Sequence, residues 1–309
     1  MIEVKDLTKD YGNRRAINHL NFKVEKGDVV GFLGPNGAGK STTMKIITGF
    51  MAPTSGSALV AGYDVFSEPL EVKKRIGYLP ETPPVYGEMY VEEYLQYVGK
   101  LKKLESSAIQ KGVNDAIEKT NLGEVRGRLI QHLSKGFRQR VGIAQALVSD
   151  PEVLILDEPT VGLDPKQVAE IRELIQGLKG QHTIILSTHI LPEVQATCEK
   201  IIIINKGEIV AQDSIHQLEL MEQGKTKIKV RLLQGNAGVA ALKSDISGVL
   251  AVEAGATDKD WFLEVKSEDT VISEVSKWLV QKNLGIVEFS PTKQDLEDVF
   301  LKLTYGKGE

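Results

Sequence analysis

Residues 34–41 place glycines, a lysine and a hydroxyl side chain at the spacing that phosphate binding requires. The stretch matches the pattern G-x-x-x-x-G-K-[ST] at every position. Glycines let successive backbone N–H groups turn toward one concave site, where Lys40 can reach the β- and γ-phosphates and Ser41 can ligate Mg²⁺. These residues therefore predict a site for a nucleoside triphosphate and its magnesium ion. The full stretch is Gly34-Pro35-Asn36-Gly37-Ala38-Gly39-Lys40-Ser41.

The segments on either side of this loop have the patterns of a strand and a helix. The apolar run at residues 29–33 is typical of a strand that is buried on both faces, and residues 42–47 open a helix. A helix that begins at the loop adds the positive end of its dipole to the phosphate site. The alternative is a glycine-rich turn that holds a lysine by chance, and the flanking strand and helix argue against it.

Two further apolar runs end in side chains suited to phosphate hydrolysis. Residues 153–156 lead into Asp157 and Glu158, and residues 184–188 lead into His189. We expect the first run to be a parallel strand beside the loop, with Asp157 near Mg²⁺ and Glu158 within reach of an attacking water. His189 is expected at the same sheet edge, in contact with the γ-phosphate. A surface carboxylate pair and a histidine with a structural hydrogen bond are the alternatives.

Two polar segments complete the set. Residues 133–140, Leu-Ser-Lys-Gly-Phe-Arg-Gln-Arg, open a helix for which Ser134 is a suitable N-cap, and residues 162–165, Gly-Leu-Asp-Pro, indicate a turn and a helix start. Together with the loop and the two strands, these segments closely resemble the ATP-binding subunit of an ABC transporter over roughly residues 1–215. The resemblance implies ATP as the nucleotide and Mg²⁺ as its metal ion.

The resemblance also implies a role for each site residue. Tyr11 would stack on adenine, and the loop from Gly34 to Thr42 would wrap the phosphates. Asp157 would organise Mg²⁺, Glu158 would polarise the attacking water, and His189 would hold that water in line with the γ-phosphate.

A second group of residues would act across a dimer. By the resemblance, Ser134 and Gly136 would contact the γ-phosphate that is bound by another subunit, and Asp164 would lie at the seam between the two. Hydrolysis would then need two cassettes arranged head to tail. We expect the second cassette to be another copy of this chain, and a heterodimer is the alternative.

The sequence departs from the family pattern at two places. The family signature is usually Leu-Ser-Gly-Gly-Gln, whereas Lys135 and Phe137 here replace one glycine and the glutamine. The residue expected to be a glutamine that touches Mg²⁺ is Glu81, which could ligate the ion through oxygen or face solvent. The stretch Tyr-Leu-Pro-Glu at residues 78–81, taken with the altered signature, resembles the ABC-2 exporter branch, which includes gliding-motility, nitrous-oxide-cluster and antibiotic-export ATPases.

Composition narrows the possible partners. The formal net charge is −4 and the basic residues are dispersed, which argues against a nucleic-acid-binding face. The single cysteine, Cys198, excludes an internal disulfide and fits a reducing compartment. The first residues show no signal-peptide pattern, and no apolar run approaches the roughly 20 residues of a membrane span. A membrane role would therefore require a partner chain.

The patterning predicts two domains and an α/β fold. Residues 1–221 would form a P-loop NTPase cassette with a mixed sheet core, an antiparallel lobe and a helical lobe over about residues 88–150. Residues 222–309 show the order β-α-β-β-α-β, which fits a small ferredoxin-like α+β domain. We expect this accessory domain to serve dimerisation or regulation, because it shows no catalytic motif.

The leading functional prediction is the ATP-hydrolysing subunit of a membrane transporter. It would lie at the cytoplasmic face of the inner or plasma membrane, held there by an integral-membrane permease of the ABC-2 type and paired with a second cassette. The alternative is a soluble ABC ATPase that acts on nucleic acid or ribosomes. Such proteins usually carry two cassettes in one chain, or a long coiled-coil or zinc-bearing insertion, and the sequence shows one cassette, no sustained heptads and no cysteine cluster.

Overall fold

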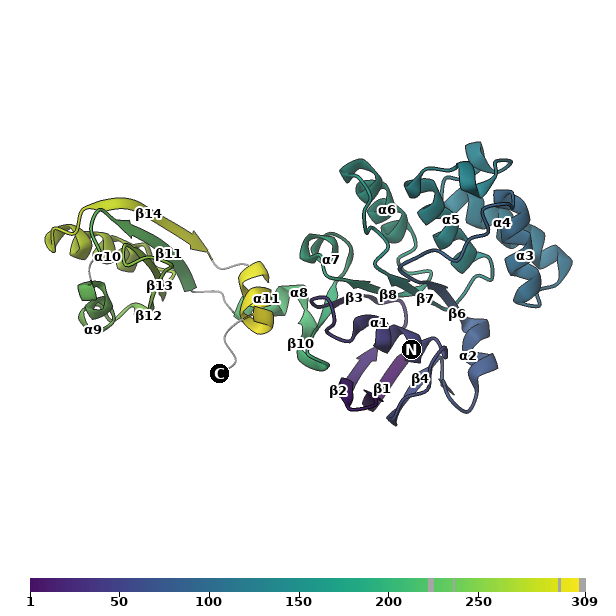
Figure 1. The fold of residues 1–309 in the computed structure, drawn as a ribbon, viewed down its shortest axis with the longest axis horizontal. Coiled ribbons are helices and arrows are strands. Elements are labelled where there is room, and N and C mark those ends of the chain that lie inside the picture. Colours follow the sequence, from purple (N-terminus) through teal and green to yellow (C-terminus); the bar gives the residue numbers. More distant parts are fainter. Residues whose placement is uncertain (222–224, 236, 294–295, 306–309) are drawn as a thin grey trace. The chain divides into compact units, whose positions relative to one another are not determined.

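The computed structural model describes residues 1–221, 225–235, 237–293 and 296–305 (Figure 1). The chain divides into two compact units, Met1–Ile215 and His216–Glu309. This division falls ahead of the expected boundary at residue 221, and residues 222–224, where the second domain was expected to begin, lie outside the described residues. Each unit has its own cluster of buried apolar side chains, so each is described by itself.

The core of the first unit is a six-stranded mixed sheet. Its inner strands are short, consist mostly of β-branched and other apolar residues, and are buried along their whole length, as parallel strands covered on both faces must be. The edge strand β10 pairs antiparallel with β9, while the other neighbours are parallel. In their order along the sheet, the strands are β10 (Glu208–Ser214), β9 (Lys200–Asn205), β3 (Val29–Leu33), β8 (Thr183–Thr188), β7 (Val153–Asp157) and β6 (Ile76–Leu79).

This order corrects one expectation. The strand that ends at Asp157, β7, is parallel to β3 as expected, but β8 lies between them. The neighbours of β3 are therefore β9 and β8, and β8 is the strand that leads into His189. The carboxyl ends of β3, β8 and β7 still lie at one sheet edge, which brings their following residues together.

A smaller antiparallel sheet forms the second lobe of this unit. Its strands are, in order, β2 (Arg14–Val24), β1 (Ile2–Tyr11), β4 (Ser55–Val60) and β5 (Tyr63–Asp64). Helix α1 (Lys40–Ile47) lies between this sheet and the central sheet (Figure 1) and contacts β2, β4, β7 and β8. The helix that begins at the phosphate loop is thus held from both sides by the two sheets.

The remaining helices of the first unit lie mostly on the opposite face of the central sheet (Figure 1). Helices α3, α4 and α5 contact one another and form the helical lobe. Helix α3 shows why it folds this way: its buried side chains, among them Val91, Leu95 and Val98, recur on one stripe at helical spacing. The helices are α2 (Pro69–Arg75), α3 (Val91–Leu101), α4 (Ser106–Lys119), α5 (Lys135–Leu147), α6 (Pro165–Gly177) and α7 (Leu191–Thr197). A further helix, α8 (Ile215–Met221), begins at the last residue of this unit and otherwise belongs to the second unit.

The second unit is an antiparallel sheet against which the two helices at residues 242–245 and 269–281 pack. Along the chain its elements are β11 (Lys225–Leu232), α9 (Leu242–Asp245), β12 (Val249–Ala254), β13 (Asp260–Lys266), α10 (Asp269–Gln281), β14 (Ile286–Lys293) and α11 (Leu296–Tyr305). The strand order in the sheet is β12-β13-β11-β14. Ile228 and Val230 of β11 pack with Val275 and Leu279 of α10, whereas the alternate residue Lys229 is half-buried and pairs with Glu288 at 3.0 Å.

Candidate functional site

The glycine loop runs from the end of β3 to the first residue of α1. Gly37 and Gly39 have φ of +79° and +110°, in the left-handed region that glycine adopts without strain. A Cβ at Gly34 would lie 2.3 Å from the backbone oxygen of Ile204, so only glycine fits there. The N–H of Gly207 donates to the carbonyl of Ala38 at 2.9 Å and supports the loop from behind. The loop is therefore a fixed backbone cradle at a helix N-terminus.

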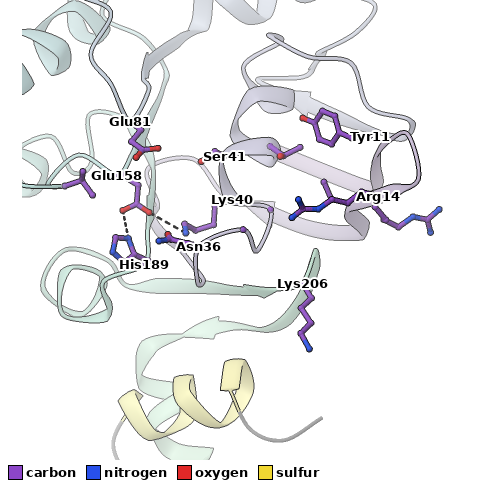
Figure 2. Close-up of a pocket in the computed structure, with 15 residues that line it drawn as sticks. Tyr11, Arg14, Asn36, Lys40, Ser41, Glu81, Glu158, His189 and Lys206 are labelled. Carbon is purple, nitrogen blue, oxygen red and sulfur yellow. Dashed lines mark hydrogen bonds and ion pairs between the residues drawn. The ribbon is translucent and has the colours of Figure 1, made fainter. Parts of the chain in front are cut away.

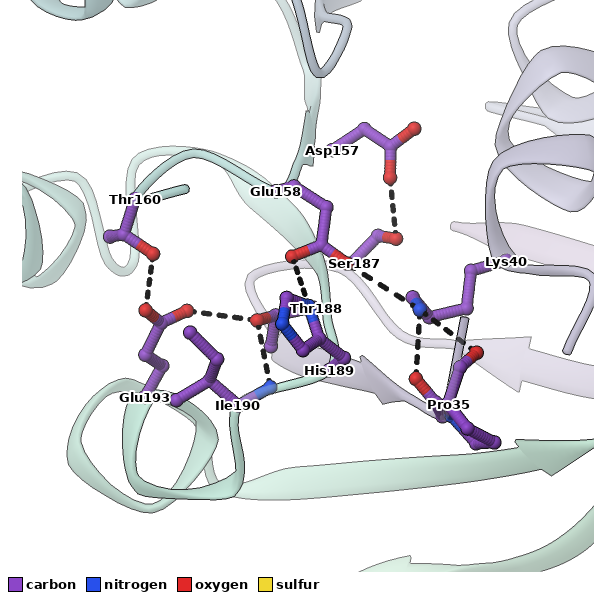
Figure 3. Close-up of polar contacts among 11 residues, drawn as sticks. Pro35, Lys40, Asp157, Glu158, Thr160, Ser187, Thr188, His189, Ile190 and Glu193 are labelled. Atoms are coloured by element: carbon purple, nitrogen blue, oxygen red, sulfur yellow. Dashed lines mark hydrogen bonds and ion pairs between the residues drawn. The ribbon is translucent and has the colours of Figure 1, made fainter. Parts of the chain in front are cut away.

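Lys40 is buried within this cradle. Its ammonium group donates to the carbonyl oxygens of Gly34 at 2.7 Å and Pro35 at 3.3 Å, and lies 3.4 Å from the carboxylate of Glu158 (Figure 3). Only 5% of its side chain is exposed. A buried cation of this kind is compensated by nearby oxygen atoms, and an anionic phosphate can replace them.

Glu158 connects Lys40 to His189. One carboxylate oxygen of Glu158 faces Lys40, and the other lies 2.9 Å from Nδ1 of His189 (Figures 2 and 3). Glu158 has φ of +50°, and its N–H donates to the carbonyl of Ser187 at 2.8 Å. A non-glycine residue at positive φ is strained, and such strain concentrates at functional sites. The buried carboxylate is held between a cation and an imidazole.

Asp157, the preceding residue, lies at the end of β7 and is buried. Oγ of Ser187 donates to its carboxylate at 2.7 Å. Burial raises the pKa of Asp157, while hydrogen bonds from Ser187 and from Ser41 act in the opposite direction. The structure thus places a carboxylate and the Ser41 hydroxyl, two oxygen groups that suit a hard divalent cation, next to each other at the loop.

A buried carboxylate that sequence reasoning missed, Glu193 of α7, holds the loops that carry these residues. It accepts hydrogen bonds from the hydroxyl groups of Thr160 and of Thr188, the latter at 2.9 Å (Figure 3). Thr188 in turn accepts from the N–H of Ile190 at 3.1 Å. The signal in the sequence was weak, because one glutamate in a short helix resembles an ordinary surface residue. In the fold it links the segment after β7 to the last residue of β8.

A cavity of about 820 Å³ opens in front of the loop (Figure 2). The structure brings most of the predicted residues to its wall, but Gly34, Pro35, Ala38 and Asp157 lie behind the lining. It adds three cations that the sequence analysis did not predict, Arg14, Arg15 and Lys206. The lining residues are Tyr11, Arg14, Arg15, Ala16, Asn36, Gly37, Gly39, Lys40, Ser41, Thr42, Glu81, Glu158, Val161, His189 and Lys206.

Tyr11 and Glu81 lie at the outer parts of this cavity. The Tyr11 side chain is 46% exposed, and its hydroxyl contacts Sδ of Met51 at 3.0 Å. Glu81 follows β6 and is exposed, so it both lines the cavity and faces solvent. Its place on the cavity wall is compatible with a magnesium ligand, and this role of Glu81 stays a prediction.

Ser134, Gly136 and Asp164 lie in a different place. Ser134 caps α5 by accepting from the N–H of Phe137, and Asp164 caps α6 by accepting from the N–H of Gln167. These residues line a second cavity of about 340 Å³, which shares no lining residue with the first. Within one chain, the signature residues are therefore not part of the loop cavity.

The donor set around the loop fits magnesium. Among the described residues, no group of three His, Cys, Asp or Glu side chains could hold a metal ion by itself. Mg²⁺ usually needs only one or two protein oxygens together with phosphates and waters. Ser41 and Asp157 supply such oxygens, and Glu81 supplies a third on the cavity wall.

Comparison with known proteins identifies the family. The ABC transporter family model matches residues 17–161. The bacitracin transport ATP-binding protein BcrA of Bacillus licheniformis is 32% identical over 99% of this chain and 98% of its own length. The chain belongs to the ABC transporter family. The ABC transporter ATP-binding protein NatA of Bacillus subtilis is 38% identical over 76% of this chain and 99% of its own length.

Solved structures agree on the fold of the ABC cassette. A structure of the ATP-binding subunit of an ABC transporter superposes with a TM-score of 0.64 at 32% identity, over 71% of this chain and 91% of that one. The dimeric structure of the bacterial cassette MJ0796 gives 0.63 at 26% identity, over 69% of this chain and 98% of that one. The predicted cassette fold and the predicted ATP-hydrolysing subunit of a membrane ABC transporter are confirmed.

The family assignment sets aside the soluble ABC ATPase that acts on nucleic acid or ribosomes. ABC cassettes bind ATP, form dimers and work with transmembrane permease subunits. No helix in the described part of this ABC subunit is long and apolar enough to cross a membrane.

Proposed function

We propose that the loop cavity binds Mg²⁺-ATP and that Glu158 activates the water that attacks the γ-phosphate. The observation that carries this proposal is the position of the Glu158 carboxylate, which contacts both Lys40 and His189. When a phosphate replaces Glu158 as the partner of the Lys40 ammonium group, the carboxylate of Glu158 becomes available to accept a hydrogen bond from water. His189 then holds the water in line, because its ring is already fixed by Glu158.

Other residues bind and orient the nucleotide. The backbone from Gly34 to Thr42 binds the phosphates, with the N-terminus of α1 directed at them. Tyr11 stacks on adenine through its exposed ring. We propose Ser41, Asp157 and Glu81 as the magnesium ligands, and the ion would neutralise charge on the β- and γ-phosphates.

We further propose that two copies of the cassette complete each other's sites. Ser134, Gly136 and Asp164 lie in a cavity separate from the loop, so within one chain they do not line the cavity of its own nucleotide. Both Ser134 and Asp164 begin helices and present helix N-termini beside that second cavity. In a head-to-tail homodimer, this polar surface contacts the γ-phosphate held by the other copy.

The membrane partner that we propose is a permease of the ABC-2 exporter type, with the cassette at the cytoplasmic face of the membrane. Support comes from relatives named for bacitracin transport and from the lantibiotic transport ATP-binding protein SrtF of Streptococcus pyogenes, which is 38% identical over 72% of this chain. The polytopic membrane protein encoded beside this chain should therefore co-purify with it from detergent. Failure of every neighbouring membrane protein to co-purify would contradict this part of the proposal.

Mixed dimers test the composite site directly. Subunits with Ser134→Arg and subunits with Lys40→Ala should each be inactive alone, because each dimer then lacks one half of both sites. In a mixed dimer, one site draws its loop and its signature from the unaltered halves, so partial ATPase activity should return. As a control, two separate preparations of the same variant are mixed, and this mixture should stay inactive. If mixed dimers form and no activity returns, either the head-to-tail arrangement is wrong or one intact site does not turn over by itself.

A further inference from the structure

The ring of Tyr11 is held in place by residues that do not line the nucleotide cavity. Tyr11 ends β1, and Figure 2 shows it on the side of the cavity opposite Glu158 and His189. An exposed tyrosine ring ordinarily exchanges between rotamers, and a ring that moves is a poor surface for stacking. Met51 and Lys9 restrain this ring from outside the cavity.

Met51 binds the hydroxyl end of the ring. The hydroxyl of Tyr11 donates to Sδ of Met51 at 3.0 Å. Met51 is itself fixed, because its side chain packs against the apolar core of the first unit and its N–H donates to the carbonyl of Lys45 at 3.1 Å. Lys45 lies in the last turn of α1. The acceptor for the Tyr11 hydroxyl therefore has a fixed position relative to this helix.

Lys9 covers one face of the same ring. Its ammonium group lies over the Tyr11 ring, 5.6 Å from the ring centroid, and donates to the carbonyl oxygen of Ala52 at 2.8 Å. A cation over an aromatic face is attracted by the negative charge of the π-system, so Lys9 stabilises this orientation of the ring. Because Lys9 occupies one face, a nucleotide base stacks on the other.

Backbone hydrogen bonds join the end of β1 to the segment that contains Met51. The N–H of Asp10 donates to Oγ1 of Thr54 at 2.9 Å, and the N–H of Thr54 donates to the carbonyl of Thr8 at 2.8 Å. This segment follows α1, and α1 begins at Lys40 of the phosphate loop. The helix therefore connects the group that binds phosphate to the residues that hold Tyr11.

We propose that Met51 and Lys9 are positioning residues that fix the Tyr11 ring for stacking on the base, and that they set the affinity for the base separately from the affinity for the phosphates. The inference rests on the proposed function, since it presumes that Tyr11 stacks on adenine. A ring that is already immobile loses no further side-chain entropy when the base binds, so the stacking energy is retained as affinity.

Two ligands separate base binding from phosphate binding. Calorimetric titration of the full chain with ATP and with inorganic tripolyphosphate, both with Mg²⁺, gives the ratio of the two affinities. Met51→Leu and Lys9→Met should each weaken ATP binding about threefold to tenfold and leave tripolyphosphate binding unchanged. A purely structural role would weaken both ligands together, so it would not change this ratio.

Further variants test whether the effects pass through the Tyr11 ring. Lys9→Arg keeps a cation over the ring and should bind ATP within about twofold of the unaltered chain. Lys5→Met is the matched control, because Lys5 is an exposed lysine of the same strand that pairs with Glu3 and does not line the cavity. Tyr11→Phe keeps the ring but loses the hydroxyl, so adding Met51→Leu to it should cause no further loss of ATP affinity.

The possible outcomes are distinguishable. If Tyr11→Ala weakens ATP binding about tenfold or more but Met51→Leu and Lys9→Met bind ATP as tightly as the unaltered chain, the positioning role is refuted while the proposed function stands. Parallel losses of ATP and tripolyphosphate affinity would show that these residues support the phosphate loop through α1, which overturns the inference. Additive losses in Tyr11→Phe and Met51→Leu would refute the action of Met51 through the hydroxyl. If Tyr11→Ala binds ATP normally, the proposed stacking on adenine fails together with this inference.

Discussion

Replacing Glu158 with glutamine removes one charge from the middle of the site and changes little else. The Glu158 carboxylate is buried, contacts Lys40 at 3.4 Å and lies 2.9 Å from Nδ1 of His189. The amide has the same shape, so the ring of His189 keeps a partner, but it is too weak a base to draw a proton from water. We expect ATP turnover to fall by about 10² to 10⁴. This corresponds to a barrier raised by about 3 to 5 kcal/mol.

The same substitution should strengthen ATP binding, although it slows ATP turnover. In the structure Glu158 contacts Lys40 at 3.4 Å, so its carboxylate would compete with a bound phosphate for this cation. If losing this competitor is worth about 1 kcal/mol, Glu158→Gln should bind ATP about fivefold more tightly. Titration with a fluorescent ATP analogue and a phosphate-release assay measure the two effects on one preparation.

Glu193→Gln is the matched control, because it alters a neighbouring buried carboxylate that contacts neither Lys40 nor His189. It should retain far more turnover than Glu158→Gln and leave ATP affinity unchanged. Turnover of Glu158→Gln at the level of the unaltered protein would remove Glu158 from the role of base. Weaker ATP binding by the same variant would show that the carboxylate supports the loop instead of competing with the nucleotide.

Three more predictions concern other parts of the chain. Lys40→Ala should weaken binding of a fluorescent ATP analogue about tenfold to a hundredfold, because a charge-assisted hydrogen bond to phosphate is lost. Lys45→Ala, at an exposed position of the same helix, is the control and should leave this affinity unchanged. Equal affinities of the two variants would exclude the loop as the nucleotide site. Burial lowers the pKa of Lys102, which follows α3, to about 8 in the folded chain, below its ordinary value of 10.5, so the unfolded chain holds more protons between these values. The difference in the free energy of unfolding between the unaltered chain and Lys102→Met should therefore be constant below pH 8 and should rise above pH 8, by up to about 1.4 kcal/mol per pH unit. Urea titrations at pH 7.5 and 9.5 measure this difference, and the same value at both pH values would refute the burial of this charge. A chain that ends at residue 221 should fold and bind ATP, because the cavity-lining residues lie before residue 215, and an insoluble product in expression trials would mean that the two units share a core.

Local patterns were sufficient for the elements and for most of the site. A parallel strand buried on both faces requires an unbroken apolar run, which is why β3, β7 and β8 could be recognised from their residues alone. The loop before α1 was equally clear, since a cradle of N–H groups needs glycine at positions such as Gly37 and Gly39, where φ is positive.

The order of strands in the sheet could not be obtained in this way. Apolar runs of similar composition do not show which strands will pair with each other in the sheet. We therefore expected β7 beside β3, where the fold places β8. The same holds for the cations Arg14 and Lys206. Arg14 is the first residue of β2 and Lys206 lies in the turn between β9 and β10, and only the folded chain brings both to the wall of one cavity.

The sequence by itself determined which chemical groups meet at the site: a glycine loop with a lysine, a pair of carboxylates and a histidine, each following a predicted strand. Those features depend on residue type and on short spacing, which a linear chain displays directly. Only the tertiary structure decided which groups touch. The contacts of Glu158 with Lys40 and His189, the hydrogen bond from Thr160 to Glu193 and the contact of Lys102 with Ile76 all join residues far apart in the chain, because tertiary packing, and not local spacing, brings them together.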